Sequence, residues 1–335
     1  MSILDRYSKL LYLEKVPDGE SLKMRQIPED IESTLIRRLE DRIGLYHLTQ
    51  RLQLEQDRGD LFTEKKVRDH VPLGSILGLL AAISGMRRRG EQNAVSPVVG
   101  SNRVVSSRLP AEFHGYRILH LSDLHLDGKF DFVDVVASVI GELDYDTCVL
   151  TGDYRLSFAD SNRFREQMQR LRGHIRSEVI GVLGNHDSLT MVPWMEDMGY
   201  RVLLNESMKL VRGDRAIDVV GVDDYHYFRC SDIEKAMRDT EEDFVLMLNH
   251  SPEQFRQAAY AGVDLYLCGH THGGQICLPG GWPPSLNLQC TRRVGSGAWR
   301  FRDMHGYTSR GVGTSLAHMR FNCPPEVVVH ELIRD

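Results

Sequence analysis

The sequence predicts an α/β (α+β) fold preceded by a helical N-terminal extension. Three observations support this prediction. From residue 115 onward, short apolar runs end in polar residues, and the helix-like stretches 132–143 and 161–172 separate the early runs. Later runs follow at closer spacing, which indicates a second, mixed sheet. The apolar runs are Tyr116–Ser122, Thr147–Thr151, Val179–Leu183, Ile217–Val222, Phe244–Leu248 and Leu265–Cys268.

Residues 1–110 are predicted to form a mostly helical extension and linker, and residues 111–335 the main domain. Within residues 28–58, apolar side chains recur at the spacing of an amphipathic helix, with a shift of phase before Leu48 and Leu52. Residues 90–110 are polar and contain Pro97, Gly100 and Pro110, which indicates a linker.

The apolar segment 71–86 is the candidate for membrane contact. It has 16 residues and is followed directly by Arg87, Arg88 and Arg89. As a helix it would be about 24 Å long, which is less than the roughly 30 Å of a bilayer core. Two interpretations stay open: an interfacial helix whose residues 71–89 contact a membrane surface, or a helix packed on the protein itself.

Composition excludes several classes of protein. With 41% hydrophobic and 26% charged residues the chain is typical of a globular protein, and a net charge of −6 argues against a nucleic-acid partner. The first 25 residues mix charged and apolar side chains and form no secretory signal. None of the six cysteines forms a Cys-x-x-Cys pair. These features favour a cytoplasmic location, on the membrane face if segment 71–86 is interfacial.

Polar residues at the ends of five apolar runs form the candidate site. In open α/β sheets, ligands bind at the carboxyl ends of the strands. Carboxylate, imidazole and amide donors suit Mn, Fe(II) or Zn, and seven donors fit two ions that share a carboxylate. Each motif alone is also compatible with a turn, but burying so many together without a cation would be costly. The donors are Asp123, His125, Asp153, Asn185, His250, His270 and His272.

The order Asp-x-His, Gly-Asp, Gly-Asn-His-Asp, Asn-His, Gly-His-x-His over residues 115–275 resembles the calcineurin-like metallophosphoesterase superfamily. The segments Gly273–Gly280, Ser309–Ser315 and Arg320–Glu326 resemble its bacterial branch, which includes the alternative UDP-2,3-diacylglucosamine pyrophosphatases of lipid A synthesis. This resemblance implies a four-layer αββα sandwich. It also implies two divalent ions per chain, with Mn preferred over Zn, Fe or Mg.

The resemblance further implies a role for each site residue. Asp123, His125 and His272 would hold the first ion, Asn185, His250 and His270 the second, and Asp153 would bridge them. His186 would be the general acid. Many relatives carry an aspartate that orients this histidine where the present chain has Leu156. Asp187 is the local candidate for that task, and its alternative is a turn cap.

The leading interpretation is a dinuclear phosphohydrolase that cleaves a phosphodiester or pyrophosphate by attack of a metal-bridged hydroxide. Its substrate would be a phosphorylated small molecule or a lipid-linked nucleotide such as UDP-2,3-diacylglucosamine. The alternatives are a general phosphodiesterase or nuclease on soluble substrates, a phosphoprotein phosphatase, and a non-catalytic scaffold, which would be expected to lack ligands. Loop 276–301, with Trp282 and Trp299, is either an apolar lid or a structural loop.

Overall fold

A computed structural model describes residues 11–14, 23–26, 29–63, 85–157, 162–315 and 317–335. Almost all of segment 71–86 lies outside these residues, so the membrane-surface prediction stays a prediction. Among the described helices, none combines the length and apolar character that crossing a membrane would require.

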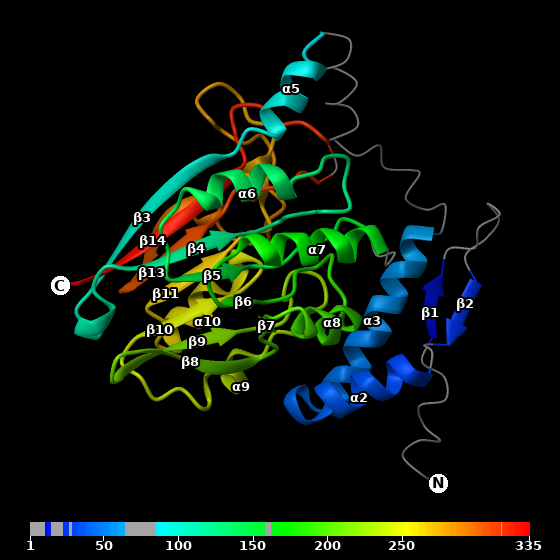
Figure 1. Ribbon diagram of the computed structural model, residues 1–335, viewed down its shortest axis with the longest axis horizontal. Coiled ribbons are helices and arrows are strands. Elements are labelled where there is room, and N and C mark those ends of the chain that lie inside the picture. Colours follow the sequence, from blue (N-terminus) through cyan, green and yellow to red (C-terminus); the bar gives the residue numbers. More distant parts are fainter. Residues whose placement is uncertain (1–10, 15–22, 27–28, 64–84, 158–161, 316) are drawn as a thin grey trace.

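Two six-stranded sheets pack face to face (Figure 1). The first sheet has the order β3 (Val98–Ser106), β14 (Glu326–Arg334), β4 (Tyr116–Leu121), β5 (Thr147–Leu150), β6 (Val179–Gly181), β7 (Tyr200–Val202). The second has the order β12 (Gly297–Phe301), β13 (Met304–Thr308), β11 (Leu265–Cys268), β10 (Val245–Leu248), β9 (Arg215–Gly221), β8 (Glu206–Arg212). A hairpin of β1 (Leu11–Glu14) and β2 (Lys23–Gln26) lies apart from them.

Helices cover the outer face of each sheet and complete four layers. On the first sheet these are α6 (Val133–Gly141), α7 (Asn162–His174) and α8 (Val192–Asp197); on the second they are α9 (Ile233–Met237) and α10 (Phe255–Tyr260). One apolar core fills the space between the sheets, and another lies under each helical layer. The predicted four-layer αββα sandwich is therefore confirmed.

The strand directions bring the site together. Strands β4, β5, β6 and β7 run parallel in the first sheet, and β9, β10, β11 and β13 run parallel in the second. Each strand alternates side chains between its two faces, and its polar residues follow where it ends. The carboxyl ends of β4, β5, β6, β10 and β11 meet at one edge of the sandwich.

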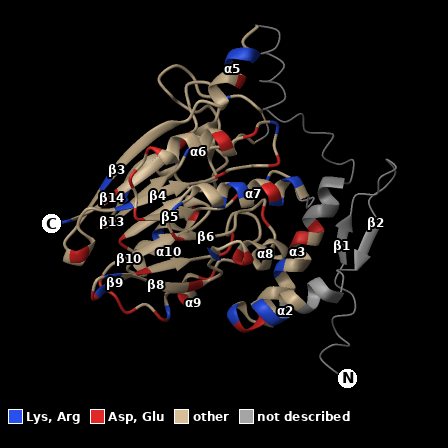
Figure 2. Cartoon of the chain, viewed as in Figure 1, with Lys and Arg blue, Asp and Glu red and all other residues tan. Residues whose placement is uncertain are grey.

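The N-terminal arm consists of α2 (Glu29–Ile43) and α3 (Leu45–Thr63), which lie beside α8 (Figure 1). The predicted shift of helical phase is a break at Gly44, whose φ of 79° ends the first helix. Leu35, Leu39 and Leu48 join the core under the first sheet. In Figure 2 both signs of charge occur along α2 and α7, and the strands are mostly uncharged.

Residues 90–110 are not a linker, which corrects the predicted domain boundary. Helix α5 (Arg87–Ala94) leads into β3, which pairs in parallel with β14 over its whole length. Strand β3 lies at the edge of the sheet, so most of its side chains are exposed or half-buried, those of Val99 and Val105 included. The main domain therefore begins before residue 98 rather than at residue 111.

Candidate metal centre

All seven predicted donors lie together at the shared edge of the two sheets, and each exposes 6% or less of its surface. The β4, β5 and β6 ends supply Asp123 and His125, Asp153, and Asn185. The β10 and β11 ends supply His250, and His270 and His272. The order of motifs predicted that these residues form one site, and the sandwich brings them together from two different sheets.

Asp123, His125 and His272 form the first group. The Nε2 atoms of the two histidines are 3.2 Å apart, and His272 Nε2 is 3.5 Å from Asp123 Oδ1. The Nδ1–H of His125 donates to the carbonyl of Arg155 at 2.9 Å, which leaves Nε2 facing the group. One nitrogen of each ring and one carboxylate oxygen therefore converge on a point suited to a divalent cation.

Asp153, Asn185, His250 and His270 form the second group. His250 Nε2 lies 3.0 Å from Asn185 Oδ1, 3.0 Å from His270 Nδ1 and 3.3 Å from Asp153 Oδ2. The other ring nitrogen of His250 donates to the carbonyl of Thr151 at 2.7 Å. This hydrogen bond to a carbonyl outside the group fixes the tautomer of His250 that presents Nε2 to the group.

Asp153 stands between the two groups. Its Oδ2 is 3.3 Å from His250 Nε2 in the second group and 4.0 Å from His125 Nε2 in the first. Its Oδ1 accepts the backbone N–H of His186 at 2.8 Å. One carboxylate oxygen thus faces both donor sets, as a bridging ligand requires.

The residues fit a pair of divalent ions by their chemistry and packing. His270 Nε2 is buried and has no hydrogen-bond partner among the described residues. A Cβ on Gly184 would collide with the Asp153 carboxylate, and one on Gly269 would collide with Ser122 and Asp123. Glycine at these positions keeps bulk away from the centre.

The electrostatics of the centre also call for cations. Burial disfavours a charged His250, but the carboxylates of Asp153, Asp123 and Asp224 together outweigh burial and raise the pKa of His250 to about 10. Burial and the neighbouring His250 and His226 hold the pKa of His270 well below its usual value. Burial raises the pKa of Asp123. Without cations, a proton on His250 is left to balance the buried carboxylates.

Five of the seven donors have left-handed backbone, with φ between 44° and 73°. Few residues other than glycine adopt this region, and such strain is concentrated at functional sites. The surrounding fold must hold these turns, since side chains at Asp123, His125, Asp153, His270 and His272 each disfavour them.

His186 lies beside the first group, with its ring centroid 5.3 Å from that of His125. Its Nδ1–H donates to the carbonyl of Leu156 at 2.7 Å. The backbone of Leu156 thus orients His186, although the Leu156 side chain offers no carboxylate for that task. His186 is half-buried, whereas the donors around it are buried.

Asp187 has a different task from the one expected. Its carboxylate accepts the backbone N–H groups of Asp153 and Gly184, both at 2.8 Å, and that of Tyr154 at 3.0 Å. It therefore fixes the loops that carry the donors, which corresponds to the turn-cap alternative. Burial and the Asp153 charge raise the pKa of Asp187 to about 7.

Sequence reasoning missed Arg320, which lies behind His272. Its Nη2 is 3.2 Å from His272 Nδ1 and 2.6 Å from the carbonyl of Gly313. Burial lowers the pKa of His272 most, and His125 and the Arg320 cation lower it further, so the ring stays neutral and able to bind metal. Only its place in a C-terminal motif could have drawn attention to it.

His226 and Glu253 also border the centre. The His226 ring lies 4.0 Å from that of His270, and His226 Nδ1 is 2.7 Å from Glu253 Oε1. His226, in the loop that follows β9, therefore borders the second group.

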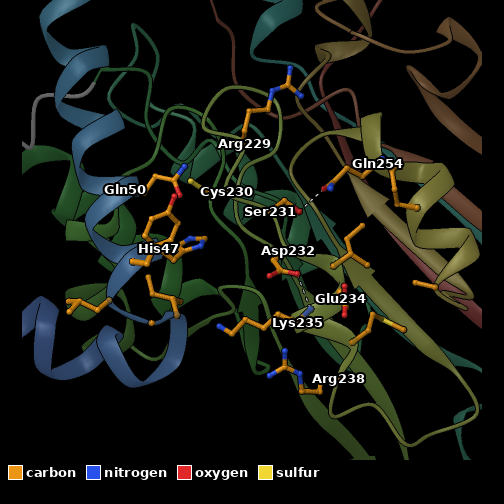
Figure 3. A pocket seen from close by; sticks show the side chains of 18 residues that line it. His47, Gln50, Arg229, Cys230, Ser231, Asp232, Glu234, Lys235, Arg238 and Gln254 are labelled. Carbon is orange, nitrogen blue, oxygen red and sulfur yellow. Dashed lines mark hydrogen bonds between the residues drawn. The ribbon is translucent and has the colours of Figure 1, made fainter.

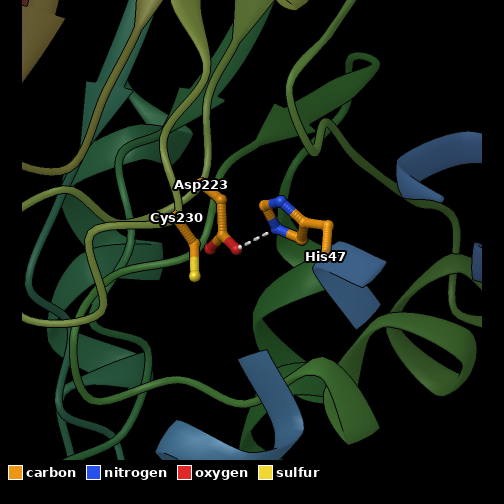
Figure 4. A group of neighbouring side chains, drawn as sticks. All are labelled: His47, Asp223 and Cys230. Atoms are coloured by element: carbon orange, nitrogen blue, oxygen red, sulfur yellow. Dashed lines mark hydrogen bonds and ion pairs between the residues drawn. The ribbon is translucent and has the colours of Figure 1, made fainter. Parts of the chain in front are cut away.

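A second cluster of potential ligands, His47, Asp223 and Cys230, lies near the arm (Figure 4). It already holds a cation, because the buried guanidinium of Arg51 lies 3.3 Å from Asp223 Oδ2. A cavity of about 960 Å³ opens beside it, between Ile43–Gln50 and residues 229–238 (Figure 3). Neither feature contains a donor of the metal centre.

Comparison with known proteins agrees with this geometry. The family model for calcineurin-like phosphoesterases matches residues 116–274. Phosphodiesterase YaeI of Escherichia coli is 30% identical over 65% of this chain and 82% of its own length. This chain belongs to the calcineurin-like phosphoesterase family. The superfamily prediction is confirmed, and the protein is a metal-dependent phosphoester hydrolase.

Two further proteins resemble this phosphoesterase. The uncharacterized metallophosphoesterase YkuE of Bacillus subtilis is 28% identical over 68% of this chain and 83% of its own length. The structure of the sulfate thiohydrolase SoxB of Thermus thermophilus aligns with a TM-score of 0.40 and 14% identity, over 67% of this chain and 57% of SoxB. That structural similarity is too distant to bear on the activity.

Proposed function

We propose that this phosphoesterase uses two divalent ions, preferably manganese, to hydrolyse a phosphodiester or pyrophosphate bond. The position of Asp153 carries the proposal, because its Oδ2 faces a histidine of each donor group. When bound, two cations supply the positive charge that offsets an anionic phosphoryl group and ease the ionisation of an attacking water.

The residues of the chain supply positioning and a proton. Asp153, held by the N–H of His186, keeps the two donor groups at a fixed separation. His186 has its Nδ1–H bound to the Leu156 carbonyl, so Nε2 is the atom from which a protonated ring would donate to the leaving oxygen. Asp187 keeps the loops of both residues in place through backbone N–H groups.

Metal analysis and an activity screen test the proposal. The full chain, stripped with chelator and reloaded with Mn²⁺, should retain about two ions and release p-nitrophenol from bis(p-nitrophenyl) phosphate faster than from p-nitrophenyl phosphate. One ion per chain, or preference for the monoester, would contradict it. Asp153→Asn is the matched variant, because it keeps the size of the side chain and removes its charge.

We further propose a lipid-linked nucleotide such as UDP-2,3-diacylglucosamine as the substrate class, met at the cytoplasmic membrane surface. The loop after the centre supports this, because Leu278 and Trp282 are exposed there at 51% and 57%. The same loop is close to the centre, since a Cβ on Gly274 would collide with Pro283. An exposed apolar surface beside a polar centre suits a substrate with an acyl chain.

Trp282→Ala tests the lipid-linked substrate separately from the chemistry. The variant should raise KM for a diacylated nucleotide and leave hydrolysis of bis(p-nitrophenyl) phosphate unchanged. Tyr260→Ala is the matched control, since Tyr260 is an aromatic residue of 66% exposure that lies on α10. Equal KM values for the lipid substrate in wild type and Trp282→Ala would exclude a contact between this loop and the lipid.

A further inference from the structure

A continuous chain of hydrogen bonds leads from the edge strand β3 to the metal donor Asp123. Asn102 Nδ2 lies 3.0 Å from His330 Nδ1, and His330 Nε2 lies 3.2 Å from His120 Nδ1. His120 Nε2 is 2.9 Å from the hydroxyl of Thr151. That hydroxyl donates to Ser122 at 2.7 Å, and Ser122 donates to Asp123 Oδ2 at 2.7 Å.

This series of hydrogen bonds crosses four neighbouring strands of the first sheet, β3, β14, β4 and β5 (Figure 1). His330 is directly opposite Asn102 in the register of β3 and β14. Both histidines are fully buried in the apolar layer between the sheets, and the Tyr307 ring of the second sheet packs 5.0 Å from His330 and 6.5 Å from His120. We call these four links between Asn102 and Asp123 (His330, His120, Thr151 and Ser122) the relay.

The direction of every hydrogen bond in the relay is determined. The Asp123 carboxylate accepts from Ser122, so the Ser122 oxygen accepts from Thr151, and the Thr151 oxygen accepts from His120 Nε2–H. Burial holds the pKa of His120 at about 3 and that of His330 well below its usual value, so both rings are neutral. Each then carries its proton on Nε2 and accepts at Nδ1. Donation therefore runs without conflict from Asn102 to Asp123.

The relay determines how Asp123 meets a cation. Its Oδ2 accepts from the Ser122 hydroxyl, whereas the backbone N–H of His270 is shared by both carboxylate oxygens, each at 3.1 Å. Its Oδ1 is the oxygen that faces His272 Nε2, at 3.5 Å. Aligned hydrogen bonds polarise one another in a dry interior, and second-sphere partners of this kind orient a metal ligand.

A relay in this position is not explained by stability. Every polar group of the relay is paired, but apolar residues of similar volume would fill the layer without needing such pairing. We propose that the relay is a positioning device that sets the affinity of the Asp123, His125 and His272 group for its divalent ion, from as far away as His330. The inference rests on the proposed two-metal function.

This inference is tested by calorimetric titration of the chelator-stripped full chain with Mn²⁺ alone. His272→Gln first identifies the binding step that belongs to the Asp123 group. His330→Phe and Thr151→Val should each weaken that step about 10- to 100-fold and leave the other step unchanged. The double variant should lose less than the sum of the two single losses, because both cut one chain.

Two further variants separate positioning from packing. His120→Gln keeps an acceptor towards His330 and a donor towards Thr151, so it should retain most of the Mn²⁺ affinity. Ile118→Val lies on the same strand and the same face as His120 and should bind Mn²⁺ as the wild type does. Thermal melting reports whether each variant is folded. If His330→Phe does not fold, the nearly isosteric Thr151→Val provides the test.

Wild-type affinity at both steps in folded His330→Phe or Thr151→Val would overturn the relay and leave the two-metal function intact. An equal loss in Ile118→Val would overturn it too, by showing a general effect of packing. A wild-type chain that binds no Mn²⁺ would instead refute the two-metal function itself, and the relay with it.

Discussion

Replacement of Arg51 by methionine is expected to destabilise the protein strongly, although Arg51 lies in the N-terminal arm. Its side chain is fully buried, with Nη1 2.7 Å from Glu55 Oε1 and Nε 3.3 Å from Asp223 Oδ2. Removing one partner of a buried ion pair costs about 3–5 kcal/mol, because the other charge stays buried without compensation. Methionine preserves apolar contact with the Phe228 ring, which lies 3.4 Å below the guanidinium.

Arg38→Met is the matched control on the same arm. Arg38 pairs with Asp197 at 2.8 Å, but the two side chains are 33% and 62% exposed. Exposed pairs contribute about 0–1 kcal/mol, so this variant should lose far less stability than Arg51→Met. Arg51→Lys should fall between them, since lysine keeps the charge and loses the planar fork.

Equilibrium urea denaturation of the metal-free full chain measures these differences, because bound ions would add their own stabilisation. Fluorescence of Trp194, which packs against the core beneath the arm, follows the transition. A free energy of unfolding that falls no further for Arg51→Met than for Arg38→Met would refute the reasoning. Arg51 Nη2 also donates to the carbonyl of Asp187 at 3.1 Å. Loss of this hydrogen bond should therefore also destabilise the loop that carries Asp187.

Three further predictions concern the centre and the arm. His186→Asn should lower kcat about 10²- to 10⁴-fold, more for an alkyl than for a p-nitrophenyl leaving group, with unchanged metal content; normal turnover would exclude a general acid role. Gly184→Ala should lower the number of bound ions, because its Cβ would collide with the Asp153 carboxylate, whereas Gly173→Ala has open space and should not. Burial raises the pKa of Glu55 to about 7. The wild type should therefore lose up to about 3 kcal/mol of stability from this group as the pH rises from about 4.5 past 7, and denaturation of Glu55→Gln should lack that loss.

Much of the fold was predictable because it is encoded locally. The six apolar runs correspond to β4, β5, β6, β9, β10 and β11, and the two helix-like stretches to α6 and α7. Strand β14 was missed although it lies between β3 and β4 in the first sheet. Its neighbours are more than 200 residues away in sequence, so no local pattern marks the pairing. The edge strand β3 was taken for a linker because it lies in a largely polar stretch that contains Pro97, Gly100 and Pro110.

The same division runs through the site. Residue type and order alone singled out the seven candidate donors that lie together at one edge, since each follows an apolar run that the sheet requires. The partners of those donors were not predictable in the same way. Arg320 behind His272, His226 beside His270 and the Leu156 carbonyl beneath His186 act through long-range contacts, which leave no periodicity.

The sequence by itself thus determined the family and the layered architecture and singled out seven candidate donors, because strand periodicity and the motifs at strand ends are properties of short segments. Only the tertiary structure decided how those donors are held. In it the Asp187 carboxylate accepts backbone N–H groups, and Arg51 of the arm pairs with Asp223. The buried relay connects His330 to Asp123. Hydrogen bonds between distant strands depend on register and packing, and these exist only once the two sheets have come together.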